Sequence, residues 1–265
     1  MSSLTPLDIY KVLPKNNCRC CRLPSCLAFA AAVVSGERKL EDCPEVDHET
    51  AAALGDAPPK EMLYEQMGME AYEKMGKEVA AIDLSQRAEK LGAVWGGEGL
   101  ELKCLGKSFI VDQKGKMVSQ CHIIPWVTVP LLEYILYGSG KEPIGKWVSL
   151  RELTEGQTWY PLFHRRCEQP LGRLADEHPE LFEDLVGLFS GARTSSEFDA
   201  DISLVLRPLP KIPLLICYWR PEEELESKLS IYLDASTDKN LSVESIHTLC
   251  VGLVIMFEKI VRRHE

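Results

Sequence analysis

The stretch LPKNNCRCCRLPSCLAFAAAVVSGERKLEDCP, residues 13–44, decides how this chain is interpreted. It holds five of the ten cysteines, and four of these have the spacing Cys18-x2-Cys21-x4-Cys26-x16-Cys43. Three thiolates close together in a tight loop, with a distant fourth that closes the site, suit a [4Fe–4S] cluster. We therefore predict that Cys18, Cys21, Cys26 and Cys43 are the ligands of such a cluster.

Two other interpretations of the cysteines remain open. Zinc prefers paired CxxC motifs or added histidines, whereas the nearest histidine here, His48, lies five residues beyond Cys43. Cys20 is an extra thiol inside the loop and could replace Cys21 as a ligand, although the first spacing would then shrink to CxC. The pattern favours a cluster over zinc, and Cys21 over Cys20.

Local sequence around the cysteines indicates how a cluster would be stabilised. The apolar run LAFAAAVV after Cys26 predicts a short helix whose positive dipole end faces the cysteine loop. Arg19 and Arg22 add positive charge beside the loop. They should raise the reduction potential of a cluster or attract an acidic partner.

Composition limits the classes of function. The chain has 265 residues, of which 45% are hydrophobic, and a formal net charge of −10, which argues against nucleic acid as a partner. The N-terminus lacks a signal-peptide pattern, and the longest apolar runs, residues 27–34 and 249–257, are too short to span a membrane. We expect a cytoplasmic protein without membrane insertion, in which disulfides do not form.

Two domains are predicted. The segment GDAPPK (55–60) contains two prolines and no apolar periodicity, and it marks a boundary between residues 1–57 and 58–265. The first domain should be small, loop-rich and cluster-binding.

The second domain should consist of antiparallel strands packed with helices, which is an α+β fold. Helices are expected at 60–91, from Thr128 or Pro130 to Gly138, at 158–175, at 178–190 and after Ser242. A β-meander is expected over 100–121, and further strands at 202–207, 213–219 and 229–233.

The cysteine segment resembles a known module. LPKNNC, PSCLAFA and DCP are similar to the iron–sulfur domain of the large subunit of the corrinoid iron–sulfur protein, whose pattern is Leu-Pro-x-x-Asn-Cys-x-x-Cys-Gly-x-Pro-Thr-Cys. Similar modules occur in ferredoxin-like subunits of anaerobic electron-transfer complexes. The resemblance covers residues 10–45 and implies the same four ligands. Arg22 replaces the pattern's glycine, and Ser25 replaces its threonine.

The rest of the chain also resembles a known family. LEYILYGSGKEPIGKWVSLREL (132–153), the PLP motif at 208–210 and LSVESIHTLCVGLVIMFEKI (241–260) are similar to a domain of unknown function. That domain is found mainly in anaerobes and is often fused to this iron–sulfur module. The resemblance covers residues 60–262 and implies an architecture but no activity.

Catalytic signatures are missing from the second domain. It has no P-loop, no GxGxxG after a strand, no HExxH, no GxSxG and no DxHxxG. The glycine-rich turn at residues 96–99 is interpreted as a connector between strands. This favours an electron-transfer or cofactor-binding protein over a stand-alone enzyme.

His122 and Trp126 are the candidate cofactor-binding residues of the second domain. A neutral imidazole at the end of the meander could ligate cobalt or another metal, and Trp126 could line the same pocket. The alternative for His122 is a structural histidine that is hydrogen-bonded at a strand end.

Other polar residues have weaker functional interpretations. On a helix, His164 and Cys167 share a face and could line a pocket, or could be structural. Arg165 and Arg166 could bind an anionic group or form a solvated face. His247 lies beside the apolar stripe of the last helix and is expected to be structural.

Two functions follow from the module. In the first, the cluster supplies single electrons to a corrinoid (cobalamin) that the large domain binds, or that a corrinoid protein presents to it. In the second, the chain is a non-corrinoid electron carrier, or an assembly or docking factor, for an anaerobic redox enzyme. The corrinoid is implied by the resemblance and by no motif in residues 58–265.

Overall fold

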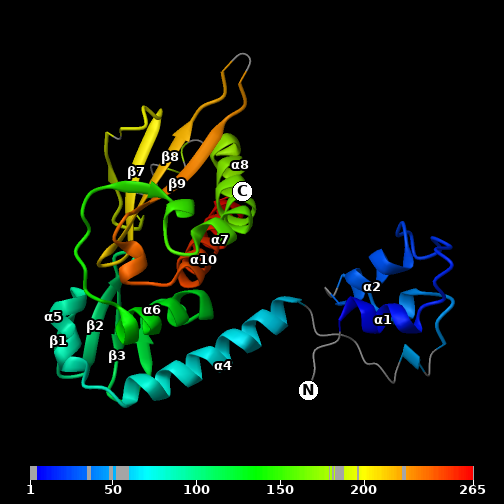
Figure 1. Cartoon of the computed structure of the whole chain (residues 1–265), viewed down its shortest axis with the longest axis horizontal. Helices are drawn as coiled ribbons and strands as arrows, with labels where there is room; N and C mark the ends of the chain where they lie inside the picture. The colour runs from blue at the N-terminus through cyan, green and yellow to red at the C-terminus, as the bar shows by residue number, and fades with distance from the viewer. Residues whose placement is uncertain are drawn as a thin grey trace. The chain divides into compact units, whose positions relative to one another are not determined.

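The structure is a computed structural model of the chain, and it describes two compact units, Met1–Glu70 and Ala71–Glu265 (Figure 1). The predicted boundary after residue 57 lies outside the described residues. These comprise the following ranges and positions: 5–34, 37–47, 50–51, 60–178, 180, 182, 188–195, 197–222 and 225–264.

The first unit packs two short helices against each other. Helix α1 (Pro6–Val12) begins at a capping box in which the Thr5 hydroxyl accepts from the Asp8 amide and the Asp8 carboxylate accepts from the Thr5 amide. Helix α2 (Cys26–Val34) is rich in alanine and valine, and the 3₁₀ turn η1 (Leu40–Asp42) follows. Their apolar residues form one small hydrophobic cluster: Ile9, Leu13, Cys26, Phe29, Ala30, Val33, Leu40, Cys43 and Ala51.

The second unit combines antiparallel strands with helices, which confirms the predicted α+β fold class. Its helices and helical turns are as follows: the end of α4 (Lys60–Ala80), η2 (Leu84–Arg87), α5 (Ala88–Leu91), α6 (Pro125–Tyr137), η3 (Leu150–Glu152), α7 (Gly156–Phe163), the π-helical turn η4 (His164–Glu168), α8 (Gln169–Glu177), η5 (Thr237–Lys239) and α10 (Val243–His264).

In the described part of this unit, two sheets, both antiparallel, supply the strands. The first has the order β1-β2-β3-β4 and contains the predicted meander, and the glycine-rich turn joins Gly96 to Gly99 between its first two strands. The second has the order β5-β9-β8-β7-β6. The strands are β1 (Val94–Gly96), β2 (Gly99–Cys104), β3 (Lys107–Val111), β4 (Met117–Ser119), β5 (Trp147–Ser149), β6 (Ala192–Arg193), β7 (Ile202–Leu209), β8 (Ile212–Trp219) and β9 (Lys228–Asp234).

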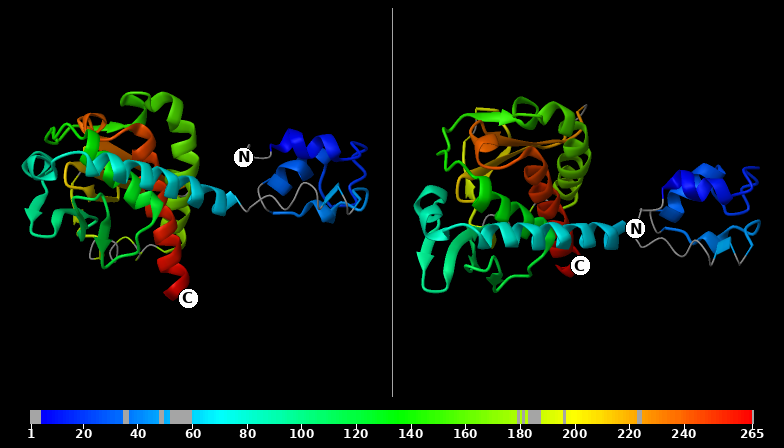
Figure 2. Two further views of the ribbon diagram at one scale, coloured as in Figure 1. Left: turned by 90° about the horizontal axis from the view of Figure 1, so that it is seen from below. Right: turned by 60° about the horizontal axis from the view of Figure 1, so that its bottom comes forward.

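Helices cover one face of the five-stranded sheet. Helix α8 and the π-helical turn η4 contact β9, and α10 packs against α6, α7 and α8. Figure 2 shows α10, in red, beside the light green α8 in both views. The core between them is continuous and apolar, with residues such as Phe163, Leu206, Ile216, Leu233 and Phe257 fully or almost fully buried.

Two helix limits differ from the prediction. The helix expected over 60–91 ends at Ala80, because the Asp83 carboxylate accepts the Ser85 amide at 3.0 Å and begins a separate 3₁₀ turn. Helix α6 begins at Pro125. Proline lacks an N–H group, and at the first position of a helix that group would have no partner within the helix. Pro130 lies inside the helix.

The end of the chain agrees with the prediction more closely. The Ser242 hydroxyl accepts the Ser245 amide at 3.2 Å before α10, as the sequence predicts. The helix expected over 178–190 falls largely outside the described residues. None of the helices that the structure describes is long and apolar enough to cross a membrane.

Candidate metal centre

The predicted ligands lie on the loop before α2, at the first residue of α2 and directly after η1. Cys26 is the first residue of α2 and Cys43 follows η1; both side chains are buried in the small hydrophobic cluster. Cys21 is partly buried against the same cluster, and Cys18 is exposed. Two thiols are thus anchored in the core, and two lie on the loop before α2.

The backbone of that loop turns repeatedly through left-handed conformations. Lys15, Asn17, Arg19 and Arg22 have φ angles of 61°, 50°, 62° and 63°. Side chains other than glycine, asparagine and aspartate adopt this region at a cost of roughly 1–2 kcal/mol. Such turns expose successive N–H groups on a concave side, which is how many iron–sulfur and phosphate sites bind anions.

Arg22 explains one departure from the module's pattern. The pattern has glycine after the second cysteine, and at this position the chain needs a positive φ that glycine adopts without strain. The arginine accepts the same conformation and places a positive charge in the loop. Its side chain is exposed.

Asparagine and serine side chains tie the loop to the start of α2. The Asn17 side-chain oxygen accepts the Cys26 amide at 2.8 Å, and the Ser25 hydroxyl accepts the Ala28 amide at 3.1 Å. The Asn16 side-chain oxygen accepts the Cys18 amide at 3.2 Å. These bonds satisfy amides at the helix N-terminus and hold two of the predicted ligands in a fixed relation.

The cysteines of the first unit influence one another's pKa values. Burial raises the pKa of Cys43, and the neighbouring Cys21 and Cys18 raise it further. A thiolate at Cys43 therefore needs a compensating charge, which a bound metal centre supplies. The pKa of Cys20 is also raised, first by a side-chain hydrogen bond with Cys18.

The donor set fits an iron–sulfur cluster. All ten cysteines are free thiols, and three of the four with the predicted spacing, Cys21, Cys26 and Cys43, are sulfur donors within or against one small core. Among the residues with described placement, no three His, Cys, Asp or Glu side chains, the four predicted ligands included, gather closely enough to hold a metal ion.

The two candidate cofactor-binding residues, His122 and Trp126, lie in different environments. His122 is exposed on the segment between β4 and α6. Trp126 lies on α6 and faces α10, where Lys259 Nζ is 5.8 Å from its ring centroid and where a side chain at Gly252 would meet its ring. Neither residue lines the cavity on the five-stranded sheet that is described below.

The π-helical turn brings together residues that the sequence did not group. His164 Nδ1 lies 2.8 Å from Glu168 Oε2, and the Tyr160 hydroxyl donates to the same carboxylate at 3.0 Å. The Ile231 amide of β9 donates to its other oxygen at 2.9 Å. Glu168 is buried and was missed; the only sequence signal was its place four residues after His164. Cys167 is fully buried, whereas His164 is half-buried.

His247 is buried, as the apolar stripe of the last helix suggests. Its Nε2 has no hydrogen-bond partner in the described structure, and its ring centroid is 5.3 Å from that of Trp159. Burial, assisted by the charge of Arg166, lowers its pKa to about 4. Arg165 and Arg166 are both exposed.

Comparison with known proteins separates the same two regions. Residues 13–45 match a family described as "Putative Fe-S cluster". The chain is 50% identical over 58 residues to the corrinoid/iron-sulfur protein large subunit of Moorella thermoacetica. It is 42% identical over 65 residues to the acetyl-CoA decarbonylase/synthase complex subunit gamma of Methanopyrus kandleri. The N-terminal module is therefore an iron–sulfur module of this kind.

The likeness to these relatives is confined to the N-terminal region. The matches cover 21% and 24% of this chain and only 13% and 14% of the two relatives, respectively. No solved structure matches the chain. The larger part of the chain, residues 83–256, matches a family model of its own. The chain belongs to the family described as Domain of unknown function (DUF3786).

Proposed function

We propose that residues 1–57 carry a [4Fe–4S] cluster on Cys18, Cys21, Cys26 and Cys43, and that the chain delivers single electrons to a corrinoid. The observation that carries the ligand set is the anchoring of Cys21, Cys26 and Cys43 at one hydrophobic cluster. Cys18 is added to the set because it directly follows Asn17. The Asn17 side chain binds the Cys26 amide and so ties this part of the loop to the start of α2. Cys20 is exposed and lies outside that cluster, as Cys18 does, and it is not assigned as a ligand because its use in place of Cys21 would shrink the first spacing to CxC.

The protein's own groups tune this centre. A bound [4Fe–4S] cluster supplies reversible one-electron transfer. The N-terminal end of α2 carries partial positive charge and stabilises the negative charge of a cluster bound there. The exposed guanidinium groups of Arg19 and Arg22 stabilise added negative charge, so they raise the reduction potential of the site.

Support for a corrinoid comes from the name of one relative, the corrinoid/iron-sulfur protein large subunit, and from the likeness of the module alone. An exposed imidazole can reach a cofactor that another protein presents, so we propose His122 as a cobalt ligand. Trp126, which is half-buried against α10, would flank this site rather than contribute a donor.

A second candidate is a docking role toward a protein partner. The gamma-subunit relatives are named as parts of a complex. In the first unit, Leu7 of α1 and Leu27 of α2 are 63% and 49% exposed, and Arg19 and Arg22 add positive charge. Exposed leucines and exposed cationic side chains in the same small unit suit an acidic redox partner that docks on the first unit.

Anaerobic purification followed by visible and EPR spectroscopy, with iron and cobalt analysis, tests the proposal. We expect cluster absorbance that dithionite bleaches, an EPR signal in the reduced state, and reoxidation of the cluster in step with reduction of added cob(II)alamin. A reduced cluster that leaves cob(II)alamin unchanged would remove the corrinoid and leave the docking role. A His122→Ala protein with an unchanged cobalamin spectrum would remove His122 as a ligand.

A further inference from the structure

The five-stranded sheet has a second face, opposite to the helices, that holds a cavity of about 430 Å³. Along β7, Leu204 and Leu206 belong to the core on the helical side. Val205 and Arg207 alternate with them and therefore project from the opposite face, where both line the cavity. A volume of this size is typical of a small-molecule site.

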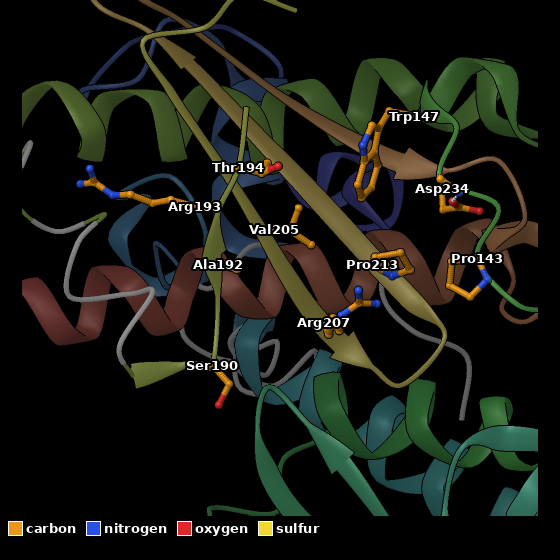
Figure 3. A pocket seen from close by; sticks show the side chains of 11 residues that line it. Pro143, Trp147, Ser190, Ala192, Arg193, Thr194, Val205, Arg207, Pro213 and Asp234 are labelled. Atoms are coloured by element: carbon orange, nitrogen blue, oxygen red, sulfur yellow. Dashed lines mark hydrogen bonds between the residues drawn. The ribbon is translucent and has the colours of Figure 1, made fainter. Parts of the chain in front are cut away.

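Apolar and aromatic side chains form most of the walls. Trp147 of β5, Val205 of β7 and Pro213 of β8 come from three strands of the sheet, and Pro143 comes from the loop before β5. In Figure 3 the Trp147 ring and the Arg207 guanidinium both project over the space between these residues. Arg193, which also lines the cavity, extends away from it.

Among the described residues, Arg207 is a cation without a counterion. In the part of the chain that the structure describes, its guanidinium has no hydrogen bond or ion pair. The register of β7 and β8 shifts between Leu206 and Leu209, and such bulges redirect a side chain out of the regular ladder. A fork of guanidinium donors left open beside an aromatic wall is suited to a carboxylate or a phosphate.

The rim of the cavity is fixed by Asp234. This fully buried carboxylate accepts the amides of Ile144 and Gly145 at 3.1 and 2.7 Å, and the Ser236 hydroxyl at 2.6 Å. Its oxygens are therefore engaged with the rim loop instead of neutralising Arg207. A rim held by a buried carboxylate is preformed, so a ligand would not have to order it.

We propose that this cavity binds a small ligand with a flat ring and one anionic group, the ring against Trp147 and the anion on Arg207. The shared chemistry admits an aromatic carboxylate or an aromatic phosphate ester such as a mononucleotide. This site is separate from the cysteine module, and the proposal does not depend on the function proposed for that module.

Calorimetric titration of the full chain, purified anaerobically, tests the proposal with matched probes. The anionic probes are 2-naphthoate and adenosine 5′-monophosphate, and the neutral counterparts are 2-naphthol and adenosine. At least one anionic probe should bind saturably, about tenfold or more tighter than its neutral counterpart, since a hydrogen bond to a charged group is worth that much. Binding of only one anionic probe identifies the anion as carboxylate or phosphate.

Variants assign the preference to the cavity. Arg207→Gln should abolish the preference for the anion, and Arg207→Lys, which keeps the charge but not the fork, should keep part of it. Arg173→Gln, an exposed site on α8, is the matched control and should bind like the parent. The proposal is overturned by an absence of saturable binding, by equal affinity for anionic and neutral probes, or by an Arg207→Gln protein that is folded by circular dichroism and keeps the preference.

Discussion

The two units use the same amino acid in different ways. In the first unit, Cys18 and Cys20 are exposed on a loop with left-handed backbone turns and two arginines. In the second unit, Cys104 and Cys250 are buried in apolar surroundings, and burial raises the pKa of each to about 12. Thiols with a pKa that high stay protonated and behave as small hydrophobic side chains. Reactivity is therefore a property of the environment, and the count of cysteines alone does not reveal it.

The units also differ in how they are stabilised. The second has a continuous core between helices and a five-stranded sheet, whereas the first has one small cluster that includes two predicted ligands. Small domains often need a metal centre to remain folded. All five tryptophans, Trp95, Trp126, Trp147, Trp159 and Trp219, lie in the second unit, so tryptophan fluorescence reports on that unit alone while cluster absorbance reports on the first.

Replacing a buried cysteine of the proposed ligand set should have the largest effect. Cys26→Ser or Cys43→Ser should abolish cluster absorbance and leave the urea transition of tryptophan fluorescence unchanged, because the first unit loses its metal centre and the second keeps its core. Iron per chain and the two optical signals measure this. Cys20→Ser is the matched control and should retain iron. A Cys26→Ser protein with full iron content would contradict the proposed ligand set.

The same truncation in the two cores should have unequal consequences. Phe29→Ala and Phe257→Ala each remove a buried ring, at a cost of about 3–5 kcal/mol in the free energy of unfolding. That loss is a large part of the stability of a small unit. Hydrogen exchange should show α1 and α2 unprotected in Phe29→Ala, whereas α10 should stay protected in Phe257→Ala. Equal loss of protection in both variants would show that the two units do not differ in how much loss of unfolding free energy they tolerate.

Acid should weaken the second unit through His247. Its pKa is lowered from 6.5 to about 4, so the unfolded chain binds the proton more readily. The contribution of neutral His247 to the free energy of unfolding is complete above about pH 6.5. It is lost as the pH falls toward 4, by up to about 3 kcal/mol at 1.36 kcal/mol per pKa unit. Urea unfolding followed by tryptophan fluorescence at several pH values measures the slope. In His247→Leu the slope over this range should flatten, and an unchanged slope would assign it to other groups.

Relieving the loop backbone should have the smallest effect. Arg22→Gly removes a side chain from a position with φ of 63° and should stabilise the folded loop by about 1 kcal/mol. Cluster absorbance should then persist to higher urea concentration. The reduction potential should fall, because a positive charge is lost. The matched control is Glu155→Gly, which changes another position with positive φ but in the second unit. It should leave cluster retention unchanged.

Local signals were predicted well. The meander, the strands β7 to β9 and the Ser242 cap depend on alternation, turn residues and capping within a few positions. The predicted end of α4 was wrong because the Asp83 side chain forms a competing hydrogen bond with the backbone inside a helical sequence pattern. Strands β5 and β6 were missed because they have three and two residues and exist through their pairing with β9 and β7.

By itself, the sequence determined the class of metal chemistry, because the type and spacing of sulfur ligands are local properties. It also determined the α+β class, because the periods of helices and strands are local as well. Only the tertiary structure decided that Arg207 and Trp147 line one cavity and that Glu168 receives an amide from β9. These residues are distant in the chain, and strand pairing and packing, which no local pattern encodes, bring them together.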